Sequence, residues 1–316
     1  MDLAKQLRDI TKEDALKSYD RLVSIPCSAP LSFSRAGLQT LDYFFLGHRL
    51  ATRIKGHSFA ENMRNPEMVE FLTDLVRRYK SKLSINYDDP MDLLPHQYSV
   101  FQLYYGTVNQ FRPAVAKWLY CKLKPKHGIL DFSAGWGGRA LAAMSLNIPY
   151  TGIDTNKSLE RAYNGMFDMI KPTSPTKIII SPAETVDYSQ FEYDLVFTSP
   201  PYFMIERYSS MPEYVSNDDF LNRFFRPVVK EVWKYLKPGG HLALNMPHAM
   251  YMACRDLLPP VSKRIRMPKH DRHPQNAVLR KTIGETKHVS HELIYVWHKD
   301  STTSIRKRKT QKRRFF

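Results

Sequence analysis

The segment Thr198-Ser199-Pro200-Pro201-Tyr202 carries the clearest chemical content of the sequence, and it follows the apolar run 193–197. Proline has a fixed φ and no N–H, and it holds the residue before it in extended geometry. We therefore predict a buried strand that ends in a rigid turn. The turn offers carbonyl oxygens, a Ser hydroxyl and a Tyr ring, and such a turn can hold a planar group with N–H donors, such as an aromatic amine.

A second segment with chemical content is Asp131-Phe132-Ser133-Ala134-Gly135-Trp136-Gly137-Gly138, between a predicted strand at 128–131 and a predicted helix at 139–144. Glycines there allow close approach of the backbone to a ligand, with the helix N-terminus behind it. Asp154 ends the next predicted strand, 19 residues after Gly135. A carboxylate at that place suits the two hydroxyls of a ribose. Together they predict a nucleotide-like cofactor, whereas Asp154 alone also fits a helix cap or a solvated acid.

The elements that position these residues alternate between strand and helix from about residue 97, which predicts a mainly parallel α/β sheet. Helices are expected to start at Phe111-Arg112-Pro113 and to cover 220–236 and about 249–258. The expected strands are 128–131, 150–154, 177–180, 193–198, 241–245, and two near 262–267 and 291–298.

Residues 1–95 are expected to be mainly helical and carry no chemical motif. Asn65-Pro66 predicts the start of a helix with apolar residues at helical spacing. Asp88-Asp89-Pro90 predicts a turn and a soft boundary. The predicted organisation is an accessory region at 1–95, a catalytic domain at 96–300 and a basic, disordered tail at 301–316.

The two motifs carry a resemblance to a known family. The first is similar to the Asp-Pro-Phe-x-Gly-x-Gly motif of class I S-adenosylmethionine-dependent methyltransferases that modify amino groups of nucleobases. The Ser-Pro-Pro-Tyr segment resembles the catalytic motif of the same family, and Lys237-Pro238-Gly239-Gly240 resembles the connection before the fifth strand. The resemblance covers about 111–298. It implies a seven-stranded Rossmann-like sheet with helices on both faces, and S-adenosylmethionine as the cofactor.

The resemblance also implies roles for single residues. The ribose is assigned to Asp154, and an aromatic contact near the cofactor to Phe111, which fits a plain core position equally well. Phe132-Ser133 departs from the usual Pro-Phe pair, and Ser181-Pro182-Ala183-Glu184 does not identify the contact with the adenine. The methionine end of the cofactor is assigned to Asp131, Ala134, Gly135 and Gly137.

The residue types also suit the mechanism. An exocyclic amine is a poor nucleophile, because its lone pair is delocalised into the ring. If the Ser199 side chain and the Pro200 carbonyl each accept one N–H, the nitrogen is held toward the methyl donor, while Pro201 stiffens the turn and Tyr202 stacks on the base. Transfer is then a direct displacement that depends on positioning, and a base in a duplex must be flipped out. By resemblance, Ser at the first motif position indicates the 4-amino group of cytosine, with adenine left open.

The formal net charge is +16, and residues 255–316 hold 17 of the 47 Lys and Arg residues but 5 of the 31 acidic ones. This excess indicates a polyanionic partner, of which nucleic acid is the obvious one. The family resemblance implies DNA in preference to RNA. The tail 306–314 has seven charges in nine residues and predicts either phosphate contacts or a nuclear import signal. A solvated tail without a specific role, and a methyltransferase-like subunit that binds without turnover, remain as alternatives.

Other classes of function have little support in the sequence. No run reaches the length of a membrane span, and the N-terminus lacks an apolar signal region, so we expect an intracellular protein. Cys27, Cys121 and Cys254 show no ligand spacing and are expected to be reduced. We expect no metal site, even from the four histidines at 270, 273, 288 and 291.

Overall fold

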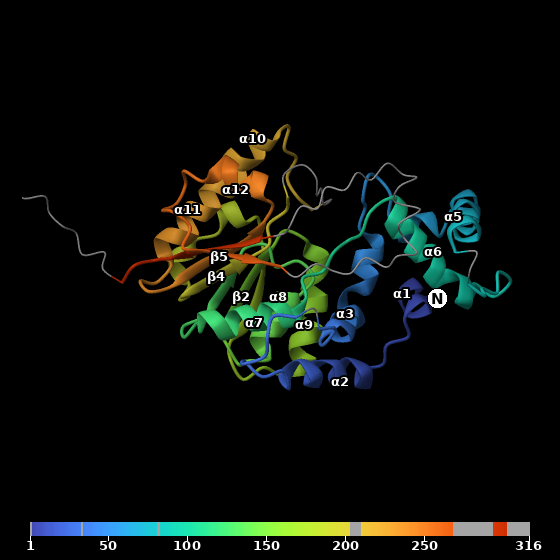
Figure 1. The fold of residues 1–316 in the computed structure, drawn as a ribbon, viewed down its shortest axis with the longest axis horizontal. Coiled ribbons are helices and arrows are strands. Elements are labelled where there is room, and N and C mark those ends of the chain that lie inside the picture. Colours follow the sequence, from blue (N-terminus) through green and yellow to red (C-terminus); the bar gives the residue numbers. More distant parts are fainter. Residues whose placement is uncertain (1, 33, 81–82, 203–209, 268–292, 302–316) are drawn as a thin grey trace, which may run out of the picture.

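The computed structural model describes residues 2–32, 34–80, 83–202, 210–267 and 293–301. They form a seven-stranded sheet with the strand order β3-β2-β1-β4-β5-β7-β6 (Figure 1). The strands β1 to β5 run parallel, and β7 is antiparallel to both of its neighbours. The strands are β1 (Ile129–Asp131), β2 (Tyr150–Asp154), β3 (Thr176–Ile180), β4 (Leu195–Thr198), β5 (His241–Met246), β6 (Lys263–Arg266) and β7 (Leu293–His298).

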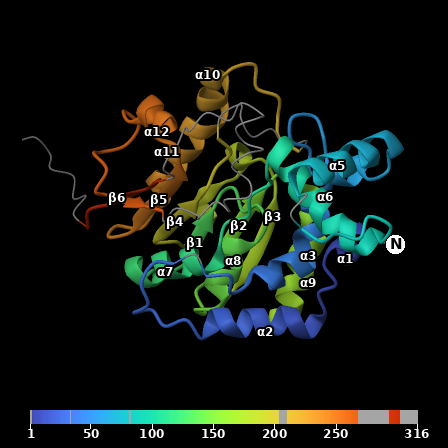
Figure 2. The same ribbon diagram turned by 45° about the vertical axis from the view of Figure 1, so that its right-hand side comes forward.

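Helices cover both faces of this sheet (Figure 2). One face is covered by α7 (Pro113–Leu123), α8 (Gly138–Met144) and α9 (Glu160–Ile170), and the other by α10 (Asn217–Phe220), α11 (Arg226–Tyr235) and α12 (His248–Cys254). The central strands are apolar on both sides because each face is buried. The predicted fold class, a seven-stranded α/β sheet of the class I methyltransferase type, is confirmed, and every expected strand is present.

The helix expected over 220–236 is interrupted. A wide π-helical turn at Leu221–Phe225 joins α10 to α11, and Pro227 follows in the first turn of α11. Proline has no N–H for the i→i−4 ladder and crowds the carbonyl one turn before it. The wider turn accommodates it, so the segment bends around the buried Phe220, Phe224 and Phe225.

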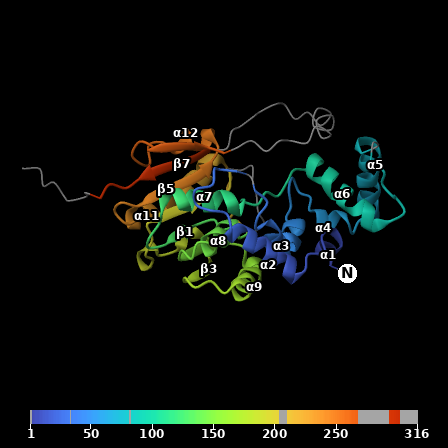
Figure 3. The same cartoon turned by 60° about the horizontal axis from the view of Figure 1, so that its bottom comes forward.

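The N-terminal helices fall into two groups. The helices α2 (Lys12–Val23) and α3 (Leu38–Ala51) pack on the sheet domain, where Leu22, Leu41 and Phe45 share its core. A second core lies away from the sheet, at the right in Figure 3. It is built by α1 (Leu3–Leu7), α4 (Phe59–Asn62), α5 (Pro66–Tyr79) and α6 (Pro90–Tyr104) together with the C-terminal half of α3.

The helix α5 begins as the sequence predicts, and α6 begins in the same way although the sequence predicts only a turn there. The Asn65 side chain accepts a hydrogen bond from an N–H in the first turn of α5, and Pro66 follows it. In α6 the Asp89 side chain accepts a hydrogen bond from an N–H of the first turn, and Pro90 follows it. The boundary expected near residue 95 falls inside α6, because the turn at 88–90 starts a helix and does not end the helical region.

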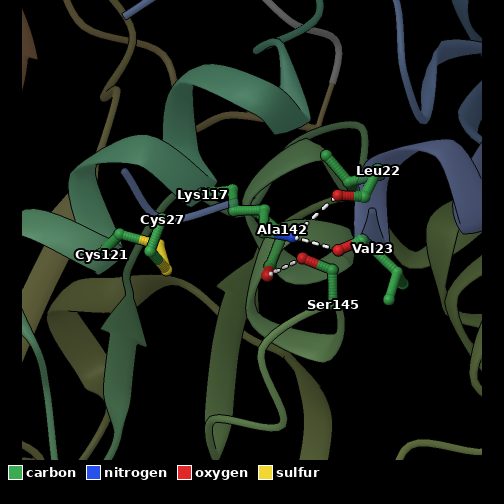
Figure 4. Close-up of a disulfide and its surroundings, with 7 residues drawn as sticks. All are labelled: Leu22, Val23, Cys27, Lys117, Cys121, Ala142 and Ser145. Atoms are coloured by element: carbon green, nitrogen blue, oxygen red, sulfur yellow. Dashed lines mark hydrogen bonds between the residues drawn. A yellow bond between two sulfur atoms is a disulfide. The ribbon is translucent and has the colours of Figure 1, made fainter. Parts of the chain in front are cut away.

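Two of the three cysteines form a disulfide, so the expectation of three reduced thiols is wrong for Cys27 and Cys121. Cys27 follows α2 and Cys121 lies on α7, with their Cα atoms 5.3 Å apart although 94 residues separate them in the chain. Beside the bridge, the buried Lys117 donates to the Leu22 and Val23 carbonyls at 2.8 Å (Figure 4). The packing of α2 on α7 brings the two cysteines together, and spacing along the chain does not reveal it.

Several sequence predictions concern residues outside the described ranges. The four histidines at 270, 273, 288 and 291 and the basic tail at 306–314 fall in this category. Within the described residues, no helix has the length and apolar character needed to cross a membrane. The same residues contain no group of three or more His, Cys, Asp or Glu with the geometry of a metal site.

Candidate active site

A cavity of about 1620 Å³ opens at the carboxyl ends of β1, β2 and β4. The strand order reverses between β1 and β4, and open α/β sheets bind their ligands at such a switch point. Small-molecule pockets occupy about 300–1,000 Å³, so this cavity has room for more than one small ligand. Of the residues predicted from the sequence, those that line it are Phe111, Ala134, Gly135, Asp154, Ser199, Pro201 and Tyr202.

Asp154 ends β2 and lines the cavity, as the sequence predicts. One of its oxygens accepts the Gly135 N–H at 2.8 Å and the other accepts the Asn156 N–H at 2.9 Å. Gly135 has a φ of +58°, which favours glycine. Each carboxylate oxygen retains one acceptor position toward the cavity. Burial raises the pKa of Asp154, and the two N–H donors oppose that increase.

Asp131 does not line the cavity, which corrects the expectation that it faces the ligand. Its side chain is fully buried. It accepts hydrogen bonds from Arg139 Nε and from the Tyr150 hydroxyl, both at 2.6 Å. Arg139 also donates a hydrogen bond to the Ser133 carbonyl. The Asp131–Arg139 ion pair therefore holds the turn after β1 in place from inside the core. The arginine itself lines the cavity, with its guanidinium 5.3 Å from the centre of the Phe111 ring.

Gly137 and Gly138 allow other parts of the chain to pack closely against the turn after β1. Gly137 does not line the cavity. A Cβ on Gly137, whose φ is +74°, would lie 2.8 Å from the ring of Phe45 on α3. A Cβ on Gly138 would lie 2.0 Å from the Phe111 carbonyl oxygen. The absence of side chains therefore lets the N-terminal region close onto the turn after β1.

The Ser-Pro-Pro-Tyr turn follows β4 as predicted. Ser199 and Tyr202 line the cavity, whereas Pro200 is buried behind it. The Ser199 and Tyr202 hydroxyl oxygens lie 3.3 Å apart. Both also contact Oδ1 of Asn245, at 3.5 and 3.4 Å. Asn245 lies on β5, is 1% exposed, and lines the same cavity.

Asn245 determines how the Ser199 hydroxyl is oriented. Its Nδ2 donates to the Leu293 backbone carbonyl at 3.3 Å, and a carbonyl can only accept, which places Oδ1 toward the two hydroxyls. An amide oxygen also only accepts, so the Ser199 hydroxyl can donate its proton to Asn245 Oδ1. The Ser199 oxygen then keeps its lone pairs, and because Ser199 lines the cavity it can accept an N–H from a ligand there.

Sequence reasoning missed Asn245, although a signal is present. It is a polar residue inside the apolar strand His241–Met246, and buried polar groups in strands require partners. The structure also gives candidate residues for the predicted contact with the adenine, which the sequence leaves unassigned. Ser181, Ala183 and Glu184, which follow β3, line the cavity.

No protein-family model matches this sequence, and no curated protein matches it either. Solved structures with a similar fold exist. TrmN from Thermus thermophilus is 17% identical over 59% of this chain and 48% of its own, with a TM-score of 0.43. A Burkholderia thailandensis 1,6-didemethyltoxoflavin-N1-methyltransferase with bound S-adenosylhomocysteine is 12% identical over 75% of this chain and 91% of its own, with a TM-score of 0.40.

A third similar structure, the [4+2]-cyclase SpnF, is 13% identical over 60% of this chain and 81% of its own, with a TM-score of 0.44. The match thus covers about half of the length of TrmN. These distant likenesses concern the fold and decide nothing about activity. The function of this chain has to be argued from its own cavity.

Proposed function

We propose that this protein transfers a methyl group from S-adenosylmethionine to an exocyclic amino group of a nucleic-acid base. The observation that carries the proposal is the Ser199 hydroxyl, which lines the cavity and can donate its own proton to Oδ1 of Asn245, so that its oxygen can accept an N–H from a ligand. Such a site accepts an N–H and rejects a carbonyl. It also lies in the same cavity as a carboxylate that can bind a ribose.

The residues around Asp154 fit the cofactor. Two acceptor positions remain on this carboxylate for the ribose hydroxyls, and Gly135 leaves the adjoining wall without a side chain. The region around Glu184 lies beyond the same end of the sheet and is the candidate for the adenine. The cofactor supplies a methyl group on a sulfonium, which is activated toward nucleophilic attack.

The chain's own residues hold and orient the amine. Ser199 accepts one N–H, which draws the lone pair of the nitrogen out of conjugation with the ring. The rigid Pro-Pro turn holds the hydroxyl in place, and Tyr202 at the cavity wall gives the base a ring to stack on. The second acceptor, the Pro200 carbonyl, remains a prediction from the family resemblance. Catalysis in this arrangement derives mainly from proximity and orientation.

The finer part of the proposal is that the target is the 4-amino group of cytosine in DNA. It rests on Ser199 at the first motif position and on the resemblance stated above. The same chemistry on adenine or on RNA uses the same acceptor, because the hydroxyl reads an amine and not the sugar. A contact with the 2′-hydroxyl would distinguish the two nucleic acids.

The test is methylation with isotopically labelled S-adenosylmethionine of single-stranded DNA, double-stranded DNA and RNA, followed by digestion and identification of the nucleosides by mass. We expect labelled 4-methylcytosine from DNA and its loss in the Ser199→Ala variant. Label on adenine or in RNA would keep the mechanism and replace the substrate. No label on any of them, with nucleic-acid binding retained, would favour a binding subunit without turnover.

A further inference from the structure

The walls of the cavity differ in charge. The wall formed by residues 8–112 contains five arginines and two aspartates, a formal net charge of +3. The rest of the lining, formed by residues 132–267, contains Arg139 against Asp154 and Glu184, a formal net charge of −1. The side that faces the predicted base and cofactor is thus slightly acidic, whereas the N-terminal helices present positive charge to the same space.

Part of this charge is not neutralised inside the protein. Arg8 and Arg49 both pair with Asp42, so that cluster still carries an excess positive charge. Arg21 on α2 donates to the neutral Gln39 amide at 2.7 Å. Among the residues that the structure describes, neither Arg21 nor Arg35 forms an ion pair with a carboxylate.

Arg35 and Arg112 both line the cavity, and their positive charges repel each other. Burial lowers the pKa of Arg112, and the positive charge of Arg35 lowers it further. Arg35 lies three residues before Leu38, the first residue of α3, and Arg112 is the N-cap residue of α7, so both are close to helices that pack on the sheet. Both residues line the cavity, and a guanidinium group there can bind an anion such as phosphate.

We propose that Arg21, Arg35 and Arg112 form a phosphate-binding wall that holds the sugar-phosphate backbone of the target strand while the base enters the Ser199 turn. This inference rests on the proposed function for the identity of the strand. Guanidinium groups bind phosphate oxygens in a bidentate manner and without sequence preference. The wall therefore supplies affinity and position, and the N-terminal helices act as part of the nucleic-acid site.

The volume of the cavity supports a strand as the occupant. At about 1620 Å³ it exceeds the size of a pocket for one small molecule, which is about 300–1,000 Å³. The acceptor of the amine and the basic wall open into this one space. An extruded nucleotide with its flanking phosphates accounts for both the amine acceptor and the basic wall, whereas a free nucleobase carries no phosphate for that wall.

The test compares binding of the full-length Arg21→Gln/Arg35→Gln variant with the wild type, by fluorescence anisotropy with labelled single-stranded and double-stranded DNA and RNA across a salt series. Each lost phosphate contact should reduce the slope of log affinity against log salt by about 0.7 for single strands and about 0.9 for duplexes. We expect a reduction of about 1.4 to 1.8 for the pair, and at least about tenfold weaker binding at low salt. The Arg21→Lys/Arg35→Lys variant should keep most of the slope.

The matched control is Arg78→Gln/Arg161→Gln, which removes the same charge from exposed positions on α5 and α9 outside the cavity. An equal loss of slope in both Gln variants would refute the phosphate-binding wall, since only net charge would then matter. An unchanged slope in the Arg21→Gln/Arg35→Gln variant would also refute it. Binding does not require turnover. If the wild type binds with the expected salt slope but transfers no methyl group, the phosphate-binding wall stands and the proposed function is refuted. If the Arg21→Gln/Arg35→Gln variant transfers methyl groups and its salt slope is unchanged, the proposed function stands and the wall is refuted.

Discussion

Replacement of Asn245 by leucine removes the acceptor that orients the Ser199 hydroxyl while nearly keeping the side-chain volume. The two hydroxyls lie 3.5 and 3.4 Å from Oδ1, which is long for hydrogen bonds between oxygens. Their net contributions therefore fall in the lower half of the usual 0.5–1.5 kcal/mol, and together they amount to about 1–2 kcal/mol. If that free energy serves to orient Ser199 in the transition state, kcat of Asn245→Leu falls by about 5- to 30-fold.

The assay measures kcat and KM for methyl transfer, together with the affinity for S-adenosylhomocysteine by calorimetry. We expect the loss in kcat, with cofactor affinity unchanged, because Asn245 contacts the Ser-Pro-Pro-Tyr turn and not the turn after β1. Asn245→Asp keeps an acceptor at the same place, so its kcat should lie between those of the wild type and the leucine variant.

The matched control for this variant is Thr198→Val, one residue before Ser199. Thr198 is fully buried and its hydroxyl has no hydrogen-bond partner among the described residues. Its removal from the core should leave kcat unchanged and cost no stability. The reasoning is refuted if Asn245→Leu keeps its kcat within about twofold, or if Thr198→Val loses as much activity as Asn245→Leu.

Three further predictions concern other parts of the molecule. Because burial raises the pKa of Asp154, affinity for S-adenosylhomocysteine should weaken as pH falls through that raised value, and calorimetry on Asp154→Asn should show weak binding without this dependence. Gly138→Ala places a Cβ 2.0 Å from a backbone carbonyl oxygen, and denaturant unfolding should show that the free energy of unfolding falls by about 1–3 kcal/mol or more. The control is Gly47→Ala on α3, where the nearest atom is 3.9 Å from the new Cβ. Its free energy of unfolding should rise by up to about 1 kcal/mol. The Cys27–Cys121 bridge closes a loop of 94 residues, so Cys27→Ser/Cys121→Ser should lower the free energy of unfolding by up to about 4.6 kcal/mol; an unchanged midpoint would show that the bridge does not form in solution.

The order of the elements could be predicted from the sequence because each signal is local. Asn65-Pro66 caps α5 within two residues, and the strand that ends at Thr198 is an apolar run stopped by two prolines. Alternation of such signals is enough to indicate a parallel sheet, and the Pro-Pro turn then has to lie at its carboxyl edge. The cavity position of Ser199 and Asp154 follows from this reasoning alone.

The remaining features depend on contacts between distant segments, which spacing along the chain does not encode. Asn245 meets Ser199 only because β5 pairs with β4. Gly137 is a glycine because the Phe45 ring, some 90 residues earlier in the chain, packs against it. Asp131 has the residue type of a ligand contact, but Arg139 and Tyr150 saturate it inside the core.

The most direct measurement of the central claim is a single-turnover transfer of labelled methyl to a DNA oligonucleotide with one cytosine, by the wild type and by Ser199→Ala, with cofactor affinity measured on the same samples. We predict that the transfer rate falls by about 10- to 100-fold, since a hydrogen bond to the developing charge contributes about 1.5–3 kcal/mol, and that cofactor affinity stays the same. Equal transfer rates for the two proteins would contradict the assignment of Ser199 as the acceptor of the amine.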